Sequence, residues 1–200
     1  MKNIAIFASG SGTNAENIIA YFSTRNTAKV ALILSNKRDS FVLERAAKNN
    51  IRSVFFDRKE FYVTGKVLRY LLLYKIDFIV LAGFLWLVPD NILEQYNDRI
   101  INIHPAILPG YGGKGMYGEY VHRAVIENRE KESGISIHFV NGSYDKGGII
   151  FQERCIVEVS DTPDTLAQKI HALEYLHYPR VIEDIVIKLP EFLIKSSEEA

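Results

Sequence analysis

Two polar residues near the middle of the chain are spaced for chemistry. Asn102 and His104 alternate with apolar residues in the run Ile100–His104, which ends before Pro105. In a strand this spacing puts both side chains on one face. An amide beside an imidazole can hydrogen-bond a developing oxyanion, and the imidazole can also move a proton. No serine or cysteine stands beside them as a nucleophile, so in an acyl transfer an amine from a second substrate could attack directly. The alternative is that both residues only close a strand.

A glycine-rich segment follows the first apolar run. It reads Ser9-Gly10-Ser11-Gly12-Thr13-Asn14-Ala15 and opens an amphipathic stretch. At such a strand-to-helix junction, backbone N–H groups and the helix dipole converge on an anion. The segment matches G-x-G-x-x-A, so a dinucleotide site stays open, with Lys37-Arg38 suited to a 2′-phosphate. However, no acidic residue ends the second strand, and the hydroxyl and amide donors favour a terminal phosphate monoester. A tight turn with Thr13 or Asn14 as N-cap is compatible with that function.

Alternating short apolar runs and amphipathic stretches must position these residues. We expect strands over Asn3–Ala8, Lys29–Ser35, Arg52–Phe56, Asp77–Ala82 and Ile100–Ile103. We expect helices over Asn14–Phe22, Ser40–Lys48, Lys59–Tyr74 and Pro89–Tyr96. This order predicts an α/β fold with a doubly wound, mostly parallel sheet. Asn102 and His104 then lie at the carboxyl end of a strand, where open α/β sheets bind ligands.

The pattern changes after the fifth strand. We expect a loop over Ile107–Gly118, a helix over Glu119–Asn128, strands over Gly134–Val140 and Gly148–Val159, and a helix from Thr162 to Val186. Asp145-Lys146-Gly147-Gly148 is typical of a hairpin turn, which predicts an antiparallel C-terminal edge. Pro179 should disturb the last helix. His138 is expected in the core or an interface, and His122 and His177 as ordinary helix residues. We expect one domain over residues 1–200, with a frayed polar tail at about 195–200.

Composition excludes several classes of function. The chain has 200 residues, of which 48% are hydrophobic, and its 24 basic and 24 acidic side chains cancel. No overall field therefore favours nucleic acid or an anionic membrane. Cys155 is the only cysteine, so neither an intrachain disulfide nor a cysteine metal cluster can form. The first apolar run is too short for a signal peptide or a membrane span, so we expect a cytoplasmic protein.

Several motifs together carry a resemblance. Asn102-Ile103-His104-Pro105-Ala106-Ile107-Leu108-Pro109, preceded by Leu81-Ala82-Gly83-Phe84, resembles the folate-dependent formyltransferase family. Further similar segments are Ser9–Asn14, Ser35-Asn36-Lys37, Gly112–Gly118 and Asp145–Ile150. They point to the members of that family that serve purine synthesis. Each motif is weak alone, but their order and spacing over residues 3 to 185 are specific.

The resemblance implies a Rossmann-like fold, a reaction and a set of site residues. The donor would be 10-formyltetrahydrofolate, a co-substrate, and the acceptor the amine of glycinamide ribonucleotide (5-phosphoribosylglycinamide), which attacks directly and gives a tetrahedral intermediate. No metal is implied. The implied catalytic residues are Asn102, His104 and Asp145. The implied acceptor-binding residues are Gly10, Ser11, Gly12, Thr13, Asn14, His171 and Glu174. The implied folate-binding residues are Lys59, Leu85, Trp86, Leu87, Val88, Asn102, Val140, Asn141, Gly142, Ser143, Tyr144 and Asp145.

Three residues depart from the family pattern, and several alternatives remain. Trp86 and Lys59 each stand where relatives have Arg, and His171 replaces Gln or Lys. If Asp145 lies against His104, its charge should raise the histidine pKa. A formyltetrahydrofolate hydrolase would need a regulatory domain for which there is no room. A tRNA formyltransferase would need a basic surface, which is not expected of a chain with zero net charge. A non-enzymatic nucleotide-binding module would leave Asn102 and His104 unused. Small molecules are the expected partners of a monomer or homodimer, without nucleic acid or membrane.

Overall fold

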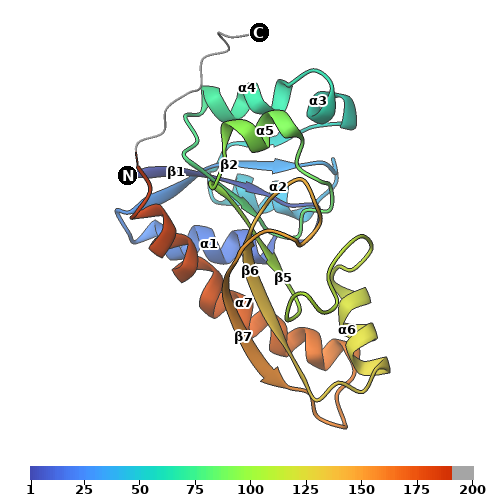
Figure 1. The fold of residues 1–200 in the computed structure, drawn as a ribbon. Coiled ribbons are helices and arrows are strands. Elements are labelled where there is room, and N and C mark those ends of the chain that lie inside the picture. The colour runs from blue at the N-terminus through green and yellow to red at the C-terminus, as the bar shows by residue number, and fades with distance from the viewer. Residues whose placement is uncertain (191–200) are drawn as a thin grey trace.

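A computed structural model describes residues 1–190, which form a seven-stranded sheet in the order β3-β2-β1-β4-β5-β6-β7 (Figure 1). The strands are β1 (Lys2–Phe7), β2 (Ala28–Ser35), β3 (Ser53–Phe55), β4 (Phe78–Leu81), β5 (Ile100–His104), β6 (Glu132–Phe139) and β7 (Ile149–Ile156). The strands β1 to β5 pair in parallel, whereas β6 and β7 pair antiparallel. The expected mostly parallel sheet with an antiparallel C-terminal edge is confirmed. The tail at 195–200 lies outside the described residues.

The strand order reverses between β1 and β4. Strand β2 pairs with one edge of β1, and β3 pairs with β2. Strand β4 then pairs with the opposite edge of β1. The carboxyl ends of β1, β4 and β5 therefore border one crevice. Ligands of open α/β sheets bind at such a reversal, outside the carboxyl ends of the strands.

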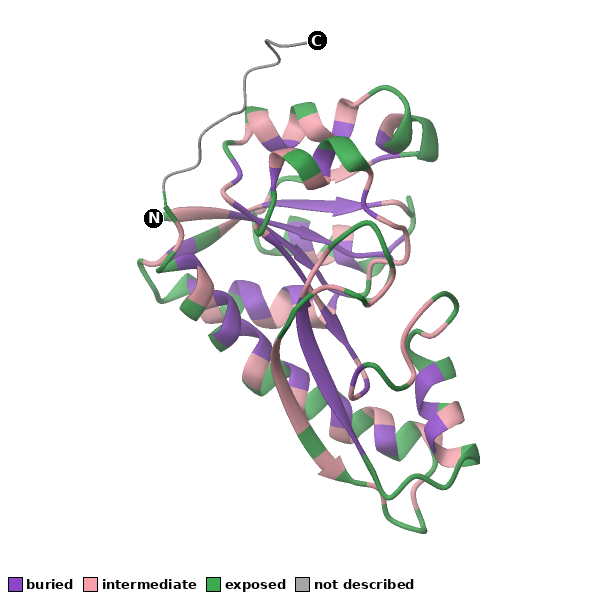
Figure 2. Cartoon of the chain, viewed as in Figure 1, coloured by how far each residue is buried: buried purple, intermediate pink, exposed green. Residues whose placement is uncertain are grey.

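Helices cover both faces of the sheet, in two separate apolar clusters. One cluster includes residues of α1 (Thr13–Ser23), α2 (Phe41–Lys48), α6 (Glu119–Glu127) and α7 (Pro163–Val186). The other includes residues of α3 (Arg58–Tyr62), α4 (Lys66–Leu73) and α5 (Asp90–Gln95). In β1, Ile4 and Ile6 pack in the first cluster while Ala5 and Phe7 pack in the second, as the two-residue period of a strand requires. Figure 2 shows the central strands as buried and the outer helix faces as exposed.

The single helix expected over Lys59–Tyr74 is wrong: the structure has α3 and α4 instead. Asp57 and Glu60 form a capping box that starts α3. Gly65, with φ +64°, then starts α4. That φ lies in the left-handed region, which glycine reaches without strain and other residues seldom adopt. The glycine therefore divides an amphipathic stretch that would otherwise continue as one helix.

At Pro179 the chain loses a helical hydrogen bond, as expected, but it stays helical from Pro163 to Val186. Proline lacks an N–H, so the carbonyl of Tyr175, four residues earlier, loses its helical donor. The Asn17 side chain of α1 supplies the missing hydrogen bond, with Nδ2 2.9 Å from the Tyr175 oxygen. A contact between helices thus offsets what the sequence of α7 alone would predict. Within residues 1–190, no helix is both long and apolar enough to cross a membrane.

Candidate active site

A cavity of about 570 Å³ opens at the carboxyl ends of β1, β4 and β5. That volume is within the usual range for a small-molecule site. The structure brings together there nearly all the residues singled out in the sequence: Gly10, Ser11, Gly12, Thr13, Asn14, Leu85, Trp86, Leu87, Val88, Asn102, His104, Val140, Asn141, Ser143, Tyr144, Asp145, His171 and Glu174. Lys59 and Gly142 do not line it. Lys59 is exposed on the short helix α3, where its neighbour Arg58 instead lies over the Trp86 ring, 5.6 Å from the centroid.

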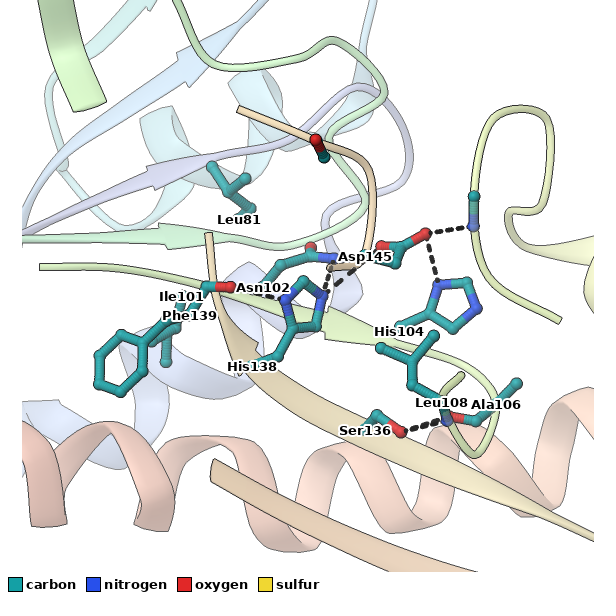
Figure 3. A network of polar contacts seen from close by, with 12 residues as sticks. Leu81, Ile101, Asn102, His104, Ala106, Leu108, Ser136, His138, Phe139 and Asp145 are labelled. Atoms are coloured by element: carbon teal, nitrogen blue, oxygen red, sulfur yellow. Dashed lines mark hydrogen bonds and ion pairs between the residues drawn. The ribbon is translucent and has the colours of Figure 1, made fainter. Parts of the chain in front are cut away.

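Four polar side chains meet in this cavity, as Figure 3 shows for Asn102, His104, His138 and Asp145. Asn102 and His104 belong to β5, and His138 lies directly opposite Asn102 on the antiparallel strand β6. His138 was expected in the core or an interface; it is buried, but it also lines the cavity. The signal that could have found it is the pairing of β6 with β5, which puts Asn102 and His138 side by side.

The proton positions on His138 follow from its partners. Its Nδ1 is 2.8 Å from the carbonyl oxygen of Phe139, which can only accept, so Nδ1 carries the hydrogen. In the neutral ring Nε2 is then an acceptor, and the Asn102 amide, with Nδ2 at 3.2 Å, donates to it. This bond orients the Asn102 side chain and leaves its second N–H free.

His104 is held in a similar way. Its Nε2 donates to the carbonyl oxygen of Tyr111 at 2.7 Å, and its Nδ1 lies 3.7 Å from Oδ2 of Asp145. Burial lowers the pKa of His104 below its ordinary value of 6.5, and the nearby His138 acts in the same direction. Asp145 and the Tyr111 carbonyl oppose that shift without reversing it. Asp145 thus raises the His104 pKa as expected, but the desolvation of the buried imidazolium outweighs this one carboxylate, so the net shift is downward.

Asp145 reaches the cavity from the loop between β6 and β7. This loop is longer than the expected hairpin turn, since β6 ends at Phe139 and β7 begins only at Ile149. Asp145 has φ +53°, and its Oδ2 accepts from the backbone N–H of Gly113 at 2.9 Å. Burial works to raise its pKa, but the nearby imidazoles of His138 and His104 and the hydrogen bond from the Gly113 N–H leave the pKa lowered. The carboxylate is therefore ionised at neutral pH.

The glycine-rich loop joins β1 to α1 without a side-chain cap. Gly12, rather than Thr13 or Asn14, is the N-cap, with φ +73°. A Cβ on Gly12 would stand 2.5 Å from the Val42 side chain of α2, so only glycine fits. The first N–H groups of α1 are therefore left without side-chain acceptors beside the cavity, as an anion site requires.

Buried polar groups of α1, α6 and α7 gather next to that loop. Nδ2 of Asn14 donates to Glu174 at 2.9 Å, while Oδ1 of Asn14 is buried without a partner among the described residues. Burial raises the pKa of Glu174 to about 7. Burial, together with His171 and His104, lowers the pKa of His122 to about 4, so His122 is a neutral cavity residue rather than an ordinary helix residue. These groups suit hydroxyl donors better than a second anion.

The opposite end of the cavity is aromatic. Phe84 and Trp86, with ring centroids 6.4 Å apart, pack in the cluster that contains α3 to α5. Neither Lys37 nor Arg38 lines the cavity, and the Arg38 guanidinium lies over Phe55 at 4.6 Å. The dinucleotide alternative therefore loses its 2′-phosphate contact. Within residues 1–190 no group of three or more His, Cys, Asp or Glu side chains could hold a metal.

Comparison with known proteins agrees with this arrangement. Residues 2–182 match the formyl transferase family. The phosphoribosylglycinamide formyltransferase of Bacillus subtilis is 35% identical over 93% of this chain and 95% of its own length. The chloroplastic phosphoribosylglycinamide formyltransferase of Arabidopsis thaliana is 37% identical over 90% of this chain, which spans 64% of that relative. The crystal structure of the Bacillus halodurans phosphoribosylglycinamide formyltransferase superposes with a TM-score of 0.84 at 37% identity, covering 94% of this chain and 96% of that one. The chain thus belongs to the formyl transferase family.

Proposed function

We propose that this protein transfers the formyl group of 10-formyltetrahydrofolate to the amine of 5-phosphoribosylglycinamide, a step of de novo purine biosynthesis. The observation that carries the proposal is the group Asn102, His104 and Asp145, which lies in one cavity with an anion-type loop and an aromatic wall. Relatives that match over most of this chain carry the corresponding name. A donor and an acceptor can therefore meet at the polar group from opposite ends of the cavity.

The acceptor fits the end formed by α1 and α7. The uncapped N-terminus of α1 and the Thr13 hydroxyl suit a phosphate monoester. The unpartnered Oδ1 of Asn14 and the Glu174 carboxyl suit ribose hydroxyls, which can donate to both. This fit explains why polar atoms are buried here at the cost of their hydration.

The folate fits the aromatic end. Phe84 and Trp86 offer apolar surface, and the backbone of Leu85–Val88 and Val140–Asn141 offers donors and acceptors for a pterin ring. When bound, 10-formyltetrahydrofolate supplies the formyl carbon and a nitrogen leaving group. Arg58, over the Tyr62 and Trp86 rings at 5.1 and 5.6 Å, replaces Lys59 as our candidate for the carboxylates of the folate tail.

The polar group then performs the transfer. Asn102 uses its free N–H to stabilise the oxyanion that develops at the formyl oxygen as the amine nitrogen attacks. His104 is neutral at rest, with Nδ1 as the basic nitrogen, so it takes the proton that the amine releases. The Asp145 carboxylate, 3.7 Å away, stabilises the transient imidazolium. His104 then returns the proton to the departing folate nitrogen, and the C–N bond to folate breaks as the new amide forms.

A formyl-transfer assay with synthetic glycinamide ribonucleotide and 10-formyltetrahydrofolate tests the proposal. We expect deformylated folate to appear only when the acceptor is present, in equal amount to the formylated product. Folate release without acceptor would instead identify a hydrolase. Binding of both ligands without release would identify a binding module, and either result would overturn the proposed transfer.

A further inference from the structure

The charges that line the cavity do not match the acceptor that we propose. A phosphate monoester carries close to two negative charges at neutral pH. Asp145 and Glu174 add acidic groups to the same cavity. Among the lining residues, all within the described part of the chain, Lys114 is the only lysine or arginine. The glycine-rich loop has no charged side chain. Burial lowers the pKa of His171, so this residue supplies no permanent positive charge either.

Lys114 is held at a defined place by a glycine-rich turn. The backbone N–H of Met116 donates to the Gly113 carbonyl at 3.1 Å, which closes a turn around Lys114. Gly113 and Gly115, on either side, have φ +101° and +89°, in the region where only glycine is unstrained. The Lys114 side chain is exposed and forms no ion pair with any acidic residue in the described chain. Its charge is therefore available to a ligand.

The turn lies toward the acceptor end of the cavity. Tyr111 and Met116, on either side of Lys114, pack against the cluster that contains α1 and α7. The folate-side residues Trp86 and Val140 pack in the other cluster. After the turn the chain enters α6, where His122 is close enough to His171 of α7 for their charges to interact. Lys114 thus shares its side of the sheet with the glycine-rich loop.

The same turn is tied to the catalytic pair. The Tyr111 carbonyl accepts from His104, and the Gly113 N–H donates to Asp145. A ligand held by Lys114 would therefore also hold the two backbone groups that orient His104 and Asp145. Loss of the lysine charge should act mainly on acceptor binding, with a smaller effect on turnover through these two contacts.

We propose that Lys114 neutralises the phosphate of the acceptor and so makes this enzyme selective for phosphorylated over unphosphorylated amines. The inference rests on the proposed function, because it needs a phosphorylated acceptor. A charge-assisted hydrogen bond to phosphate accounts for a tenfold or larger gain in affinity. Lysine serves here as a point charge on a flexible stem, which the exposed position of Lys114 allows.

The test compares glycinamide ribonucleotide with the same molecule lacking its phosphate, glycinamide riboside. We expect Lys114→Met to lower kcat/KM for the ribonucleotide by ~10- to 100-fold, mainly through KM, and to leave kcat/KM for the riboside nearly unchanged. Lys114→Arg keeps the charge and should recover most of the loss. Lys48→Met, at an exposed lysine of α2 outside the cavity lining, is the matched control and should behave as wild type.

Three results would contradict the inference in distinguishable ways. An equal loss with both acceptors would show that Lys114 does not act on the phosphate. A loss that appears as a higher KM for the folate, and vanishes with 10-formyltetrahydropteroate, would assign the lysine to the folate carboxylates. Full activity of Lys114→Met on the ribonucleotide would overturn only this inference, whereas an inactive wild type would overturn the proposed function and this inference with it.

Discussion

At the residue scale, the reaction centre depends on where two imidazoles carry their hydrogens. Backbone carbonyls can only accept, so Tyr111 fixes the hydrogen of His104 on Nε2, and Phe139 fixes that of His138 on Nδ1. His104 consequently directs its basic nitrogen at Asp145, and His138 accepts from Asn102. In the proposed mechanism the two carbonyls thereby give two otherwise similar side chains different roles: His104 moves a proton and His138 orients an amide.

The two β5 side chains should each be needed for turnover. We expect Asn102→Ala and His104→Ala to lower kcat by at least ~100-fold, the usual cost of one oxyanion donor or general base, while thermal melting shows a folded protein. Asn97→Ala, at an exposed asparagine outside the cavity lining, is the control and should be fully active. Near-normal turnover of both cavity variants would show that this end of β5 is not the reaction centre.

The Asp145 charge should be visible in the titration of His104. Burial already lowers the His104 pKa, and Asp145 partly offsets that shift. Asp145→Asn removes the offset, so the His104 pKa should fall further below 6.5, and the acid limb of the pH–rate profile should move to lower pH. Maximal turnover should fall as well, because the transient imidazolium loses its counter-charge. NMR titration of His104 in both proteins measures the shift. An unchanged or higher His104 pKa in the variant would show that Asp145 is not its electrostatic partner.

At the scale of single elements, α7 combines a structural role with the binding role that we propose for it. It packs against α1 and α6, and Asn17 of α1 satisfies the carbonyl that Pro179 leaves free. The same helix buries Glu174 beside Asn14, with only 6% of the residue exposed. A carboxyl at this depth stays protonated up to a pH near 7, which makes the packing of α7 sensitive to pH.

Glu174→Gln should remove that sensitivity. The pKa of Glu174 is raised from 4.5 to about 7, so the folded state holds the proton more tightly than the unfolded chain does. The stability that this provides is present below pH 4.5 and is lost as the pH rises through about 7. Glutamine does not titrate, so it does not lose stability in this pH range. The free energy of unfolding of the variant, relative to that of wild type, should therefore rise by up to about 3 kcal/mol from pH 5 to pH 8. Urea unfolding at both values measures this gain, and Glu127→Gln, at an exposed residue of α6, should give none.

At the scale of the whole molecule, the proposed acceptor and folate sites lie at two ends of one cavity. The proposed acceptor end is formed by elements of the first apolar cluster, and the proposed folate end by elements of the second. The polar group on β5 and β6 lies between them. Asn14 and Trp86 line opposite ends of the cavity, so a change of one of these side chains should leave binding at the other end largely intact.

This independence can be measured by calorimetry. We expect Asn14→Leu to weaken binding of glycinamide ribonucleotide by about tenfold and to leave a folate analogue nearly unaffected. Trp86→Ala should weaken the folate analogue by a similar factor and spare the ribonucleotide. In the double variant the two losses should add within about 0.5 kcal/mol. The opposite pattern of losses would mean that the two ends have been assigned the wrong way round.

The sequence by itself determined the α/β class, the strand order along the chain and most residues of the cavity. Alternation along β5 put Asn102 and His104 on one face, and the glycine pattern predicted the loop before α1. These inferences are local, because the two-residue period of a strand and the conformational freedom of glycine act over a few neighbouring positions.

Only the tertiary structure decided the remaining features, because each depends on groups far apart in the chain. The partnership of His138 with Asn102 arises from the pairing of β6 with β5. The Tyr175 carbonyl, which Pro179 deprives of its helical donor, accepts a hydrogen bond from Asn17, 158 positions away. The sign of the His104 pKa shift depends on burial, which no pattern of charges along the chain reveals. Desolvation and long-range hydrogen bonds are properties of the packed molecule, and here they set the chemistry of residues that the sequence had already located.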